Sequence, residues 1–259
     1  MSSVPIDDYR GFIVDIDGVL VRGSEPIPDA AEALDRLGER GRMVLLSNNA
    51  TRTRRAIADR LQSLGFSIDP AMVVNSAFIV AEHLQQELGA TAVFTIGEAG
   101  LRQELRMADH TIVEPDDADV VITGMDRELT YGKLADALRA LVRGARYIAT
   151  NADATFPTPD GPTPGAGAIV GALRGMGYPP ERIVGKPSTT AFEIAMETLG
   201  IDEPGECLVI GDRLETDIEG ALNAGCDAAL VLSGVTSRAE LARSEIRPSY
   251  VVESIEAII

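Results

Sequence analysis

The chain has 259 residues, of which 45% are hydrophobic and 24% are charged, so it can fold as one large α/β domain or two modest ones and is not globally disordered. A formal net charge of -17 argues against a nucleic-acid partner, because phosphate backbones attract basic faces. The sequence contains no apolar run of about 18 residues and no basic, hydrophobic leader pattern. We therefore expect a soluble, cytoplasmic protein without membrane contacts.

Lysine is nearly absent from this acidic chain and occurs only at Lys133 and Lys186. Such a composition resembles proteins of halophilic organisms, whose solvated carboxylates keep the surface hydrated; an arginine-biased genome is the alternative explanation. Cys207 and Cys226 lack a metal-type spacing, and we interpret both as small buried hydrophobic residues. With two isolated histidines besides, the sequence does not predict a zinc site.

Short apolar strands alternate with helical patterns along nearly the whole chain, which predicts a parallel sheet covered by helices. The predicted strands cover residues 11–16, 42–48, 71–75, 92–97, 119–124, 146–151, 207–212 and 228–233. The predicted helices cover residues 28–40, 53–65, 76–89, 131–144, 188–200 and 215–225. Because the middle third repeats the pattern, it indicates a second, smaller domain inserted into the first.

Two regions interrupt the alternation of strands and helices. The stretch "EPDDADV" is predicted to be a polar turn, and "TFPTPDGPTPGAG", residues 155–167, a Pro/Gly-rich loop too long for a simple connector. Long ordered loops of this kind often carry binding functions. The glycine run "GAGAIVG" has no strand before it, so we expect it to open a helix rather than bind a dinucleotide.

The stretch "FIVDIDGVLV", residues 12–21, has two interpretations. Apolar runs on both sides of Asp-Gly are typical of a two-residue β-hairpin, in which Asp17 and Gly18 only form the turn. Alternatively, Asp15 and Asp17 project to the same side of one strand, roughly 7 Å apart, where they repel by about 2 to 3 kcal/mol at an effective dielectric constant near 20. Such a pair requires a cation or a shared proton. Taken alone, this stretch leaves both interpretations open.

Acidic residues also follow a second apolar strand, in "LVIGDRLETDI". Asp212 ends that strand and Asp217 lies near the start of the next helix, where either could also serve as a helix cap. Acids at two independent strand ends favour one acidic pocket, because open α/β sheets bind ligands at the carboxyl ends of their strands. Hard oxygen ligands of this kind suit Mg²⁺.

A third strand ends in "VLLSNNATRT", with Ser47 and Asn48 at a junction between a strand and a helix. Hydroxyl, amide and backbone N–H donors at such a junction can bind phosphate, or they can simply cap the helix. The stretch "VGKPSTTAFE" adds Lys186 before another helix. A lone lysine is usually a solvated surface charge, but a loop lysine in this lysine-poor chain also suits an anion site.

The stretches "DIDGVL", "LLSNNATRT", "GKPS" and "GDRLETDI", in this order, resemble the four motifs of the haloacid dehalogenase superfamily. The resemblance runs from about Gly11 to at least Leu232 and is to the NagD-like, 4-nitrophenylphosphatase-like subfamily, type IIA, with a large cap between the second and third motifs. It implies a doubly wound, Rossmann-like catalytic core of residues 1–77 and 182–259. The implied cap is a smaller inserted α/β domain of residues 78–181.

The resemblance also implies a role for each acidic residue. Asp15 matches the nucleophile that forms an aspartyl-phosphate, and Asp17 matches the general acid/base, whose main-chain carbonyl helps to hold the metal. Asp15 and Asp212 match the direct carboxylate ligands of Mg²⁺. Asp217 matches a residue that supports the metal's waters or Lys186.

The polar residues receive roles by the same resemblance. Ser47 and Lys186 match the groups that bind the phosphoryl oxygens, with assistance from the Asn48 backbone. In the cap, "TNAD" supplies Asn151 and Asp153 as candidate substrate contacts; a purely structural turn is the alternative. Caps of this family commonly pair two subunits, which implies a homodimer through the cap.

Together these motifs predict a Mg²⁺-dependent phosphatase that acts on a small phosphomonoester, such as a sugar phosphate. A phosphomutase or another phosphotransferase of the superfamily is the alternative, whereas dehalogenation does not need the second acid, Asp17. A phospho-accepting regulatory domain also uses Asp, Mg²⁺ and Lys, but such domains are typically shorter and lack a cap. The individual substrate is not fixed by these residues.

Overall fold

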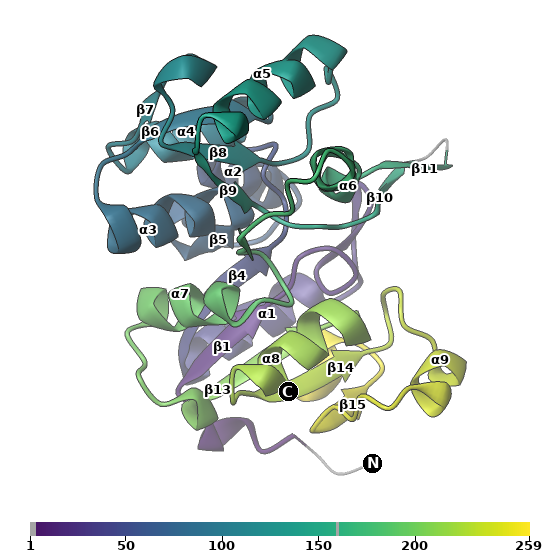
Figure 1. Ribbon diagram of the computed structural model, residues 1–259. Helices are drawn as coiled ribbons and strands as arrows, with labels where there is room; N and C mark the ends of the chain where they lie inside the picture. Colours follow the sequence, from purple (N-terminus) through teal and green to yellow (C-terminus); the bar gives the residue numbers. More distant parts are fainter. Residues whose placement is uncertain (1–3, 159–160) are drawn as a thin grey trace. The chain divides into compact units, whose positions relative to one another are not determined.

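The computed structural model describes residues 4–158 and 161–259, which form two compact units (Figure 1). Unit 1 consists of the described residues within 1–47, 55–74 and 186–259, and unit 2 of those within 48–54 and 75–185. Each unit is a sheet covered by helices, which confirms the predicted α/β fold class. The predicted domain limits, after residues 77 and 181, stay a prediction. Every helix of the described residues is too short or too polar to span a bilayer.

The core sheet of unit 1 has six strands in the order β15-β14-β13-β1-β4-β5, and the pairings from β15 to β4 are parallel. Its strands are β1 (Gly11–Val14), β4 (Arg42–Ser47), β5 (Val73–Asn75), β13 (Cys207–Gly211), β14 (Asp227–Val231) and β15 (Tyr250–Val252). In the central register, Val14 lies opposite Leu45 of β4 and Ile210 of β13. The three strands therefore end at the same edge of the sheet, where Asp15, Ser47 and Asp212 follow or end them.

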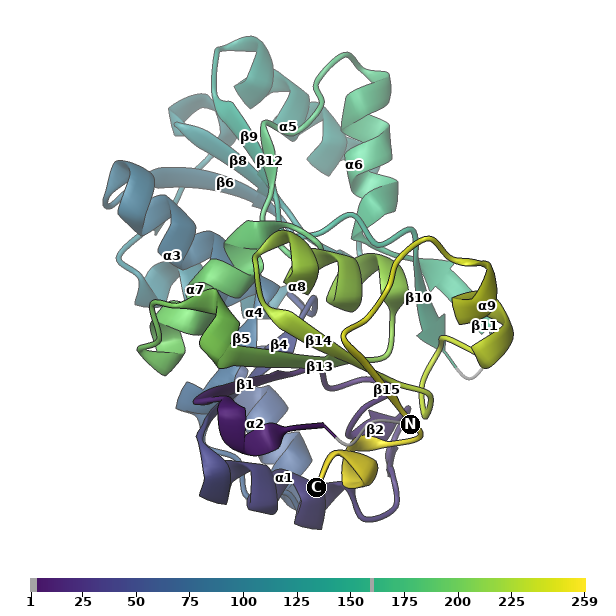
Figure 2. The ribbon, with the colours of Figure 1, turned by 90° about the horizontal axis from the view of Figure 1, so that it is seen from below.

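Continuous apolar runs make these central strands suitable for a sheet that is covered on both faces. All four residues of β1 and all five of β13 are buried. On one face, α1 and α2 share a buried cluster with β1 and β4 that includes Phe12, Leu34 and Leu61, while α7 and α8 lie on the other face (Figure 2). The helices of unit 1 are α1 (Ala30–Arg40), α2 (Arg54–Ser63, of which Arg54 belongs to unit 2), α7 (Thr189–Leu199), α8 (Glu219–Asn223) and α9 (Arg238–Arg243).

The predicted hairpin signal after the first strand is displaced along the chain. Strand β1 ends at Val14, and the antiparallel pair β2 (Val21–Arg22) and β3 (Glu25–Pro26) forms the hairpin instead. Gly18 takes a φ of 93°, a left-handed conformation that favours glycine because it has no Cβ. Asp15 and Asp17 consequently lie in a turn and not on the face of one flat strand, so the argument from strand alternation does not apply to them.

Unit 2 contains a second parallel sheet, in the order β12-β9-β8-β6-β7. Its strands are β6 (Ala92–Ile96), β7 (Thr111–Ile112), β8 (Val120–Thr123), β9 (Arg146–Ala149) and β12 (Arg182–Ile183). Helices α5 and α6 pack on one face around Leu141, Tyr147 and Leu173, and α3 and α4 pack against each other on the opposite face (Figure 2). The helices of unit 2 are α3 (Ser76–Leu88), α4 (Ala99–Met107), α5 (Tyr131–Val142) and α6 (Ala166–Gly175).

The Pro/Gly-rich stretch of residues 155–167 is not the irregular loop that the sequence predicts. Strands β10 (Thr155–Thr158) and β11 (Gly161–Pro164) pair in an antiparallel hairpin, and α6 begins at Ala166, as the glycine run predicts. Prolines fit this hairpin because it has only two strands, so each strand has one unpaired edge. A proline has no backbone N–H, and on an unpaired edge none is needed for a hydrogen bond. Residues 159 and 160 lie outside the described residues.

Candidate active site

A buried lysine lies between two carboxylates at the carboxyl edge of the core sheet. Lys186 Nζ donates hydrogen bonds to Asp15 Oδ1 at 2.5 Å, to Asp217 Oδ1 at 2.6 Å and to the main-chain oxygen of Leu46 at 3.2 Å. The side chains of Lys186, Asp15 and Asp217 are 5%, 12% and 2% exposed. These distances and exposures make a dehydrated network of charges in which each group depends on the others.

Asp212 joins the same network from the end of β13. Its Oδ2 accepts a hydrogen bond from the Val235 main-chain N–H at 2.7 Å. Asp217, in a π-helical turn over Leu214–Ile218, accepts from the main-chain N–H groups of Asp212 at 3.2 Å and Arg213 at 3.0 Å through its Oδ2. The backbone after β14 thus binds Asp212, and the backbone after β13 is held by Asp217.

Two glycines allow the chain to approach Asp212 closely. A Cβ on Gly18 would lie 2.2 Å from Asp212 Oδ2, and one on Gly234 would lie 2.0 Å from the same atom. Both distances are far shorter than a van der Waals contact. The turn after β1 and the loop after β14 therefore pack around this carboxylate only because both positions lack a side chain.

Asp15, Asp212 and Asp217 fit a divalent cation. Each offers one carboxylate oxygen, and these atoms all lie within 4.8 Å of one another. Asp212 Oδ1 is buried and has no hydrogen-bond partner among the described residues, 4–158 and 161–259. Because a buried carboxylate oxygen without a partner is costly, and hard oxygen ligands suit Mg²⁺, the donor set matches a magnesium-type ion.

The network shifts the pKa of Asp15, Asp212 and Lys186. Burial raises the pKa of Asp15 well above its ordinary value, with the Lys186 ammonium acting in the opposite direction. Burial, followed by the charge of Asp217, raises the pKa of Asp212 to about 6. For Lys186, burial alone would lower the pKa, but the Asp15 and Asp217 carboxylates outweigh it and hold the pKa above its ordinary value. Lys186 is therefore a cation at neutral pH, and the acids require positive charge nearby.

The other predicted site residues take several positions. Asp17 is exposed in the turn after β1 and is not part of the carboxylate cluster, and Ser47 is buried at the end of β4. Asn48, the first residue of unit 2, contacts both predicted cap residues: its Nδ2 lies 3.3 Å from both carboxylate oxygens of Asp153, and its main-chain oxygen accepts from Asn151 Nδ2 at 2.8 Å. Asn48, Asn151 and Asp153 therefore form one group within unit 2.

Sequence reasoning missed several groups that complete the acidic site. The Leu46 main-chain oxygen binds Lys186, the Val235 N–H binds Asp212, and Ser233 Oγ donates to the Gly18 main-chain oxygen at 2.8 Å. Main-chain groups carry no signal of residue type. The run "SGVTS" after the last strong apolar strand is the available hint, because a Ser-Gly dipeptide indicates a turn.

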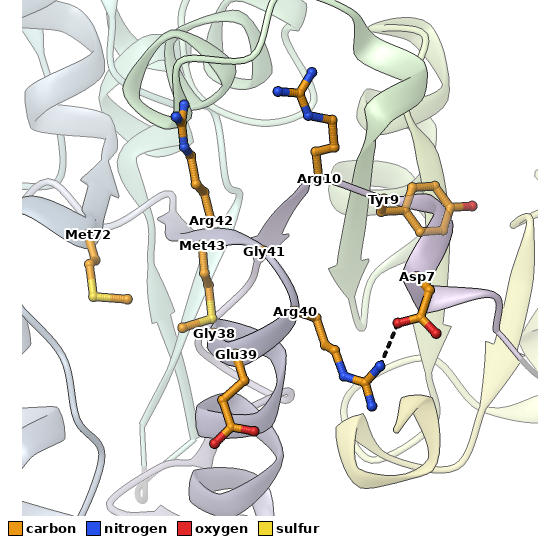
Figure 3. A pocket seen from close by; sticks show the side chains of 10 residues that line it. All are labelled: Asp7, Tyr9, Arg10, Gly38, Glu39, Arg40, Gly41, Arg42, Met43 and Met72. Carbon is orange, nitrogen blue, oxygen red and sulfur yellow. Dashed lines mark hydrogen bonds and ion pairs between the residues drawn. The ribbon is translucent and has the colours of Figure 1, made fainter.

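A pocket of unit 1 lies away from these residues, at the amino-terminal ends of β1 and β4 (Figure 3). Its lining residues are Asp7, Tyr9, Arg10, Gly38, Glu39, Arg40, Gly41, Arg42, Met43 and Met72. Its three arginines already have partners: Arg40 binds Asp7 at 2.6 Å, Arg10 binds Glu206 at 3.0 Å, and Arg42 binds the main-chain oxygen of Leu199 at 2.7 Å. With its cations engaged in this way, the pocket is not an evident anion site.

Comparisons with known proteins match this chain to one family of hydrolases. Two family models match, "Haloacid dehalogenase-like hydrolase" over residues 12–111 and "HAD-hyrolase-like" over residues 183–258. The 5′-nucleotidase YutF of Bacillus subtilis is 36% identical over 249 residues, which covers 95% of this chain and 96% of the relative.

Two solved structures resemble it along nearly its whole length. The p-nitrophenyl phosphatase from Archaeoglobus fulgidus has a TM-score of 0.92 and 38% identity, covering 97% of this chain and 98% of the other. The glycerol phosphate phosphatase from Mycobacterium tuberculosis, in complex with magnesium, has a TM-score of 0.91 and 33% identity, covering 100% of this chain and 78% of the other.

Proposed function

This chain belongs to the haloacid dehalogenase-like hydrolases, in their NagD-like group, and is a phosphatase; from that premise we propose that it hydrolyses a small phosphomonoester in a Mg²⁺-dependent reaction through an aspartyl-phosphate at Asp15. The observation that carries this proposal is the hydrogen bond of Lys186 to both Asp15 and Asp217, beside Asp212. This arrangement of four side chains supplies a nucleophile, a fixed positive charge and a set of metal ligands at one sheet edge.

The first half of the reaction forms a bond from Asp15 to phosphorus. Because Lys186 binds Oδ1 of Asp15, we assign Oδ2 to attack on phosphorus, while the bond from phosphorus to the leaving oxygen breaks. Asp17 gives its proton to that oxygen, which departs as an alcohol. The exposed position of Asp17, in the turn two residues after Asp15, suits a group that exchanges protons with substrate and water.

The second half returns the enzyme to its starting state. Asp17, now a carboxylate, takes a proton from a water molecule, the water oxygen bonds to phosphorus, and the acyl-phosphate bond to Asp15 breaks. Inorganic phosphate leaves, and the proton stays on Asp17 for the next turnover. Ser47 and Lys186 bind the phosphoryl oxygens, assisted by the main chain of Asn48.

Mg²⁺ would be held by Asp15, Asp212 and the main-chain oxygen of Asp17, with Asp217 beside them. When bound, it supplies positive charge to the phosphoryl oxygens, the main electrostatic requirement of phosphoryl transfer. Asp217 keeps Lys186 aligned, since one of its oxygens binds the ammonium and the other binds two main-chain N–H groups. Lys186 in turn favours the ionised form of Asp15, because its charge opposes the rise in the pKa of Asp15 that burial causes.

The substrate proposal follows the chemistry of the relatives. One relative is named a 5′-nucleotidase, and two similar structures are a p-nitrophenyl phosphatase and a glycerol phosphate phosphatase. Their substrates share a terminal phosphate monoester and differ in the leaving alcohol. We accordingly propose a small phosphomonoester, and a panel of nucleoside, sugar and glycerol phosphates as the screen.

The experiment that tests this function measures phosphate release from 4-nitrophenyl phosphate with Mg²⁺ and with EDTA. We expect turnover that requires Mg²⁺ in the wild type and no turnover in Asp15→Asn. Full activity of Asp15→Asn, or of the EDTA-treated enzyme, would overturn the proposal. With a sugar monophosphate, an isomeric product in place of free phosphate would indicate a mutase.

A further inference from the structure

The seven-residue segment 48–54 is separated in sequence from the rest of unit 2, yet it packs within that unit. A side chain of unit 2 binds the segment at each end. At its start, the Asn48 main-chain oxygen accepts from Ser76 Oγ at 2.7 Å and from Asn151 Nδ2 at 2.8 Å. At its end, Arg54 donates to both carboxylate oxygens of Glu104, from its main-chain N–H at 3.0 Å and from Nε at 3.1 Å.

The middle of the segment is held as closely as its ends. Asn75 Nδ2 donates to the Arg52 main-chain oxygen at 2.8 Å, and the Gly100 N–H donates to the Thr51 main-chain oxygen at 3.2 Å. A Cβ on Gly100 would lie 2.5 to 2.6 Å from main-chain atoms of Thr51 and Arg52, so no side chain fits between α4 and the segment. These contacts fix the backbone of the segment to unit 2.

The contacts of Asn48 fix both its main-chain oxygen and its side-chain amide. Two donors bind the main-chain oxygen of Asn48. Its side-chain Nδ2 lies 3.3 Å from each of the two carboxylate oxygens of Asp153. Asp153 is itself oriented, because its main-chain N–H donates to Asn151 Oδ1 at 3.1 Å. A residue held at its carbonyl and at its side chain has little freedom in φ and ψ, so the direction of its own N–H is set as well.

We propose that Asn151 and Asp153 are positioning residues that orient Asn48, and that through Asn48 they set the affinity of this enzyme for the phosphoryl group itself. The inference rests on the proposed function, in which the Asn48 main chain assists in binding phosphate. The Asn48 N–H belongs to the peptide that joins it to Ser47, the last residue of β4. A change in the orientation of Asn48 therefore also moves the Asn48 N–H donor, which lies next to Ser47 in the chain.

This role differs from the substrate contact that the sequence predicts for the same two residues. A side chain that recognises the leaving alcohol affects each phosphomonoester differently and leaves the binding of inorganic phosphate unchanged. A carboxylate that faces the phosphate directly would repel it, so removal of Asp153 would tighten phosphate binding. Removal of a positioning residue weakens the binding of every phosphate compound by the same factor.

The test measures the inhibition constant of inorganic phosphate, together with kcat/KM for 4-nitrophenyl, glycerol and nucleoside monophosphates. For Asp153→Ala we expect the inhibition constant to rise about tenfold, with an equal loss of kcat/KM for all three substrates, as for the loss of a hydrogen bond to a charged group. Asp153→Asn should retain most of the affinity, since its amide oxygen can still accept from Asn48. Asp116→Ala removes an exposed carboxylate of the same unit and should change nothing.

A double-mutant cycle tests whether Asp153 acts through Asn48. In an Asn48→Ala background we expect Asp153→Ala to cost no further affinity, whereas independent roles would make the two losses multiply. Ser76→Ala, which removes the other donor to the Asn48 oxygen, should raise the inhibition constant in the same direction and provides a second variant if Asp153→Ala does not fold.

An unchanged or lower inhibition constant in folded Asp153→Ala, or losses that multiply in the cycle, would overturn the inference. All measurements begin from a wild type that releases phosphate and an Asp15→Asn variant that does not. Failure of that first step rejects the proposed function, and failure of the later steps alone rejects the positioning role.

Discussion

Replacing Lys186 with methionine tests whether one buried ammonium balances the carboxylates of the site. Lys186 Nζ lies 2.5 Å from Asp15 and 2.6 Å from Asp217, distances at which opposite unit charges attract by roughly 6 kcal/mol each at an effective dielectric constant near 20. The burial of all three groups offsets much of that attraction. We expect Lys186→Met to lower the free energy of unfolding by about 3 to 5 kcal/mol at pH 7.5, because two buried carboxylates lose their partner.

The loss should depend on pH and on Mg²⁺. The folded-state pKa of Asp15 is raised, so Asp15 binds protons more readily in the folded than in the unfolded chain, and its contribution to stability improves as the pH falls toward the ordinary carboxyl value near 4. Without Lys186 that pKa rises further, so the destabilisation should be smaller at pH 5 than at pH 7.5. We expect Mg²⁺ to bind the folded cluster and not the unfolded chain, so that it also restores part of the stability.

Urea unfolding followed by circular dichroism measures these effects at both pH values, with EDTA and with Mg²⁺. The other lysine offers a matched control, because Lys133 binds one carboxylate, Asp126, at 2.7 Å and is 35% exposed. Lys133→Met should cost about 1 to 2 kcal/mol and show no response to Mg²⁺. A Lys186→Met loss that equals the control and stays constant with pH and Mg²⁺ would refute the charge balance described above.

Three further outcomes follow from the same structure. Glu104→Gln should destabilise the protein by about 3 to 5 kcal/mol, because it breaks a buried ion pair with Arg54. Glu32→Gln, which breaks an exposed ion pair, should cost at most about 1 kcal/mol, and thermal melting distinguishes the two variants. The affinity for Mg²⁺, measured by calorimetry, should fall as the pH drops through about 6, where Asp212 takes up a proton that competes with the metal, and a pH-independent affinity would contradict this. Gly234→Ala should reduce phosphate release at least tenfold with the fold retained, since its Cβ would lie 2.0 Å from Asp212 Oδ2, and wild-type turnover would show that the loop can move aside.

Much of the acidic site could be predicted from residue types and their positions at strand ends. Asp15 and Asp212 each follow a continuous apolar run, and neighbouring parallel strands bring their carboxyl ends together, so their proximity follows from the pattern. The prediction that Lys186 lies in the same phosphoryl site as Asp15 depends on the resemblance to the family, because a loop lysine carries no positional information of its own. The structure brings the two side chains into contact.

The remaining parts of the fold and site depend on contacts that a sequence pattern does not encode. The hydrogen-bond partners of Asp212 and Lys186 include main-chain groups of Val235 and Leu46, which any residue type could supply. Strands β7 and β12 have two residues each and owe their existence to the neighbouring strand rather than to propensity. The placement of segment 48–54 with unit 2 arises from partners dozens of residues away, such as Glu104 and Asn151.

The pairing of β1 with β13 has a consequence for the order in which the chain folds. Gly11 lies opposite Cys207, so the central pairing of the core sheet joins residues that are almost two hundred positions apart. Nearly all of unit 2, by contrast, is one continuous stretch, residues 75–185, whose strands pair with near neighbours. Since closing a long loop costs more entropy than closing a short one, we expect the inserted unit to fold first during synthesis. We then expect the edge of β1 that pairs with β13 to stay unpaired until the last third of the chain leaves the ribosome.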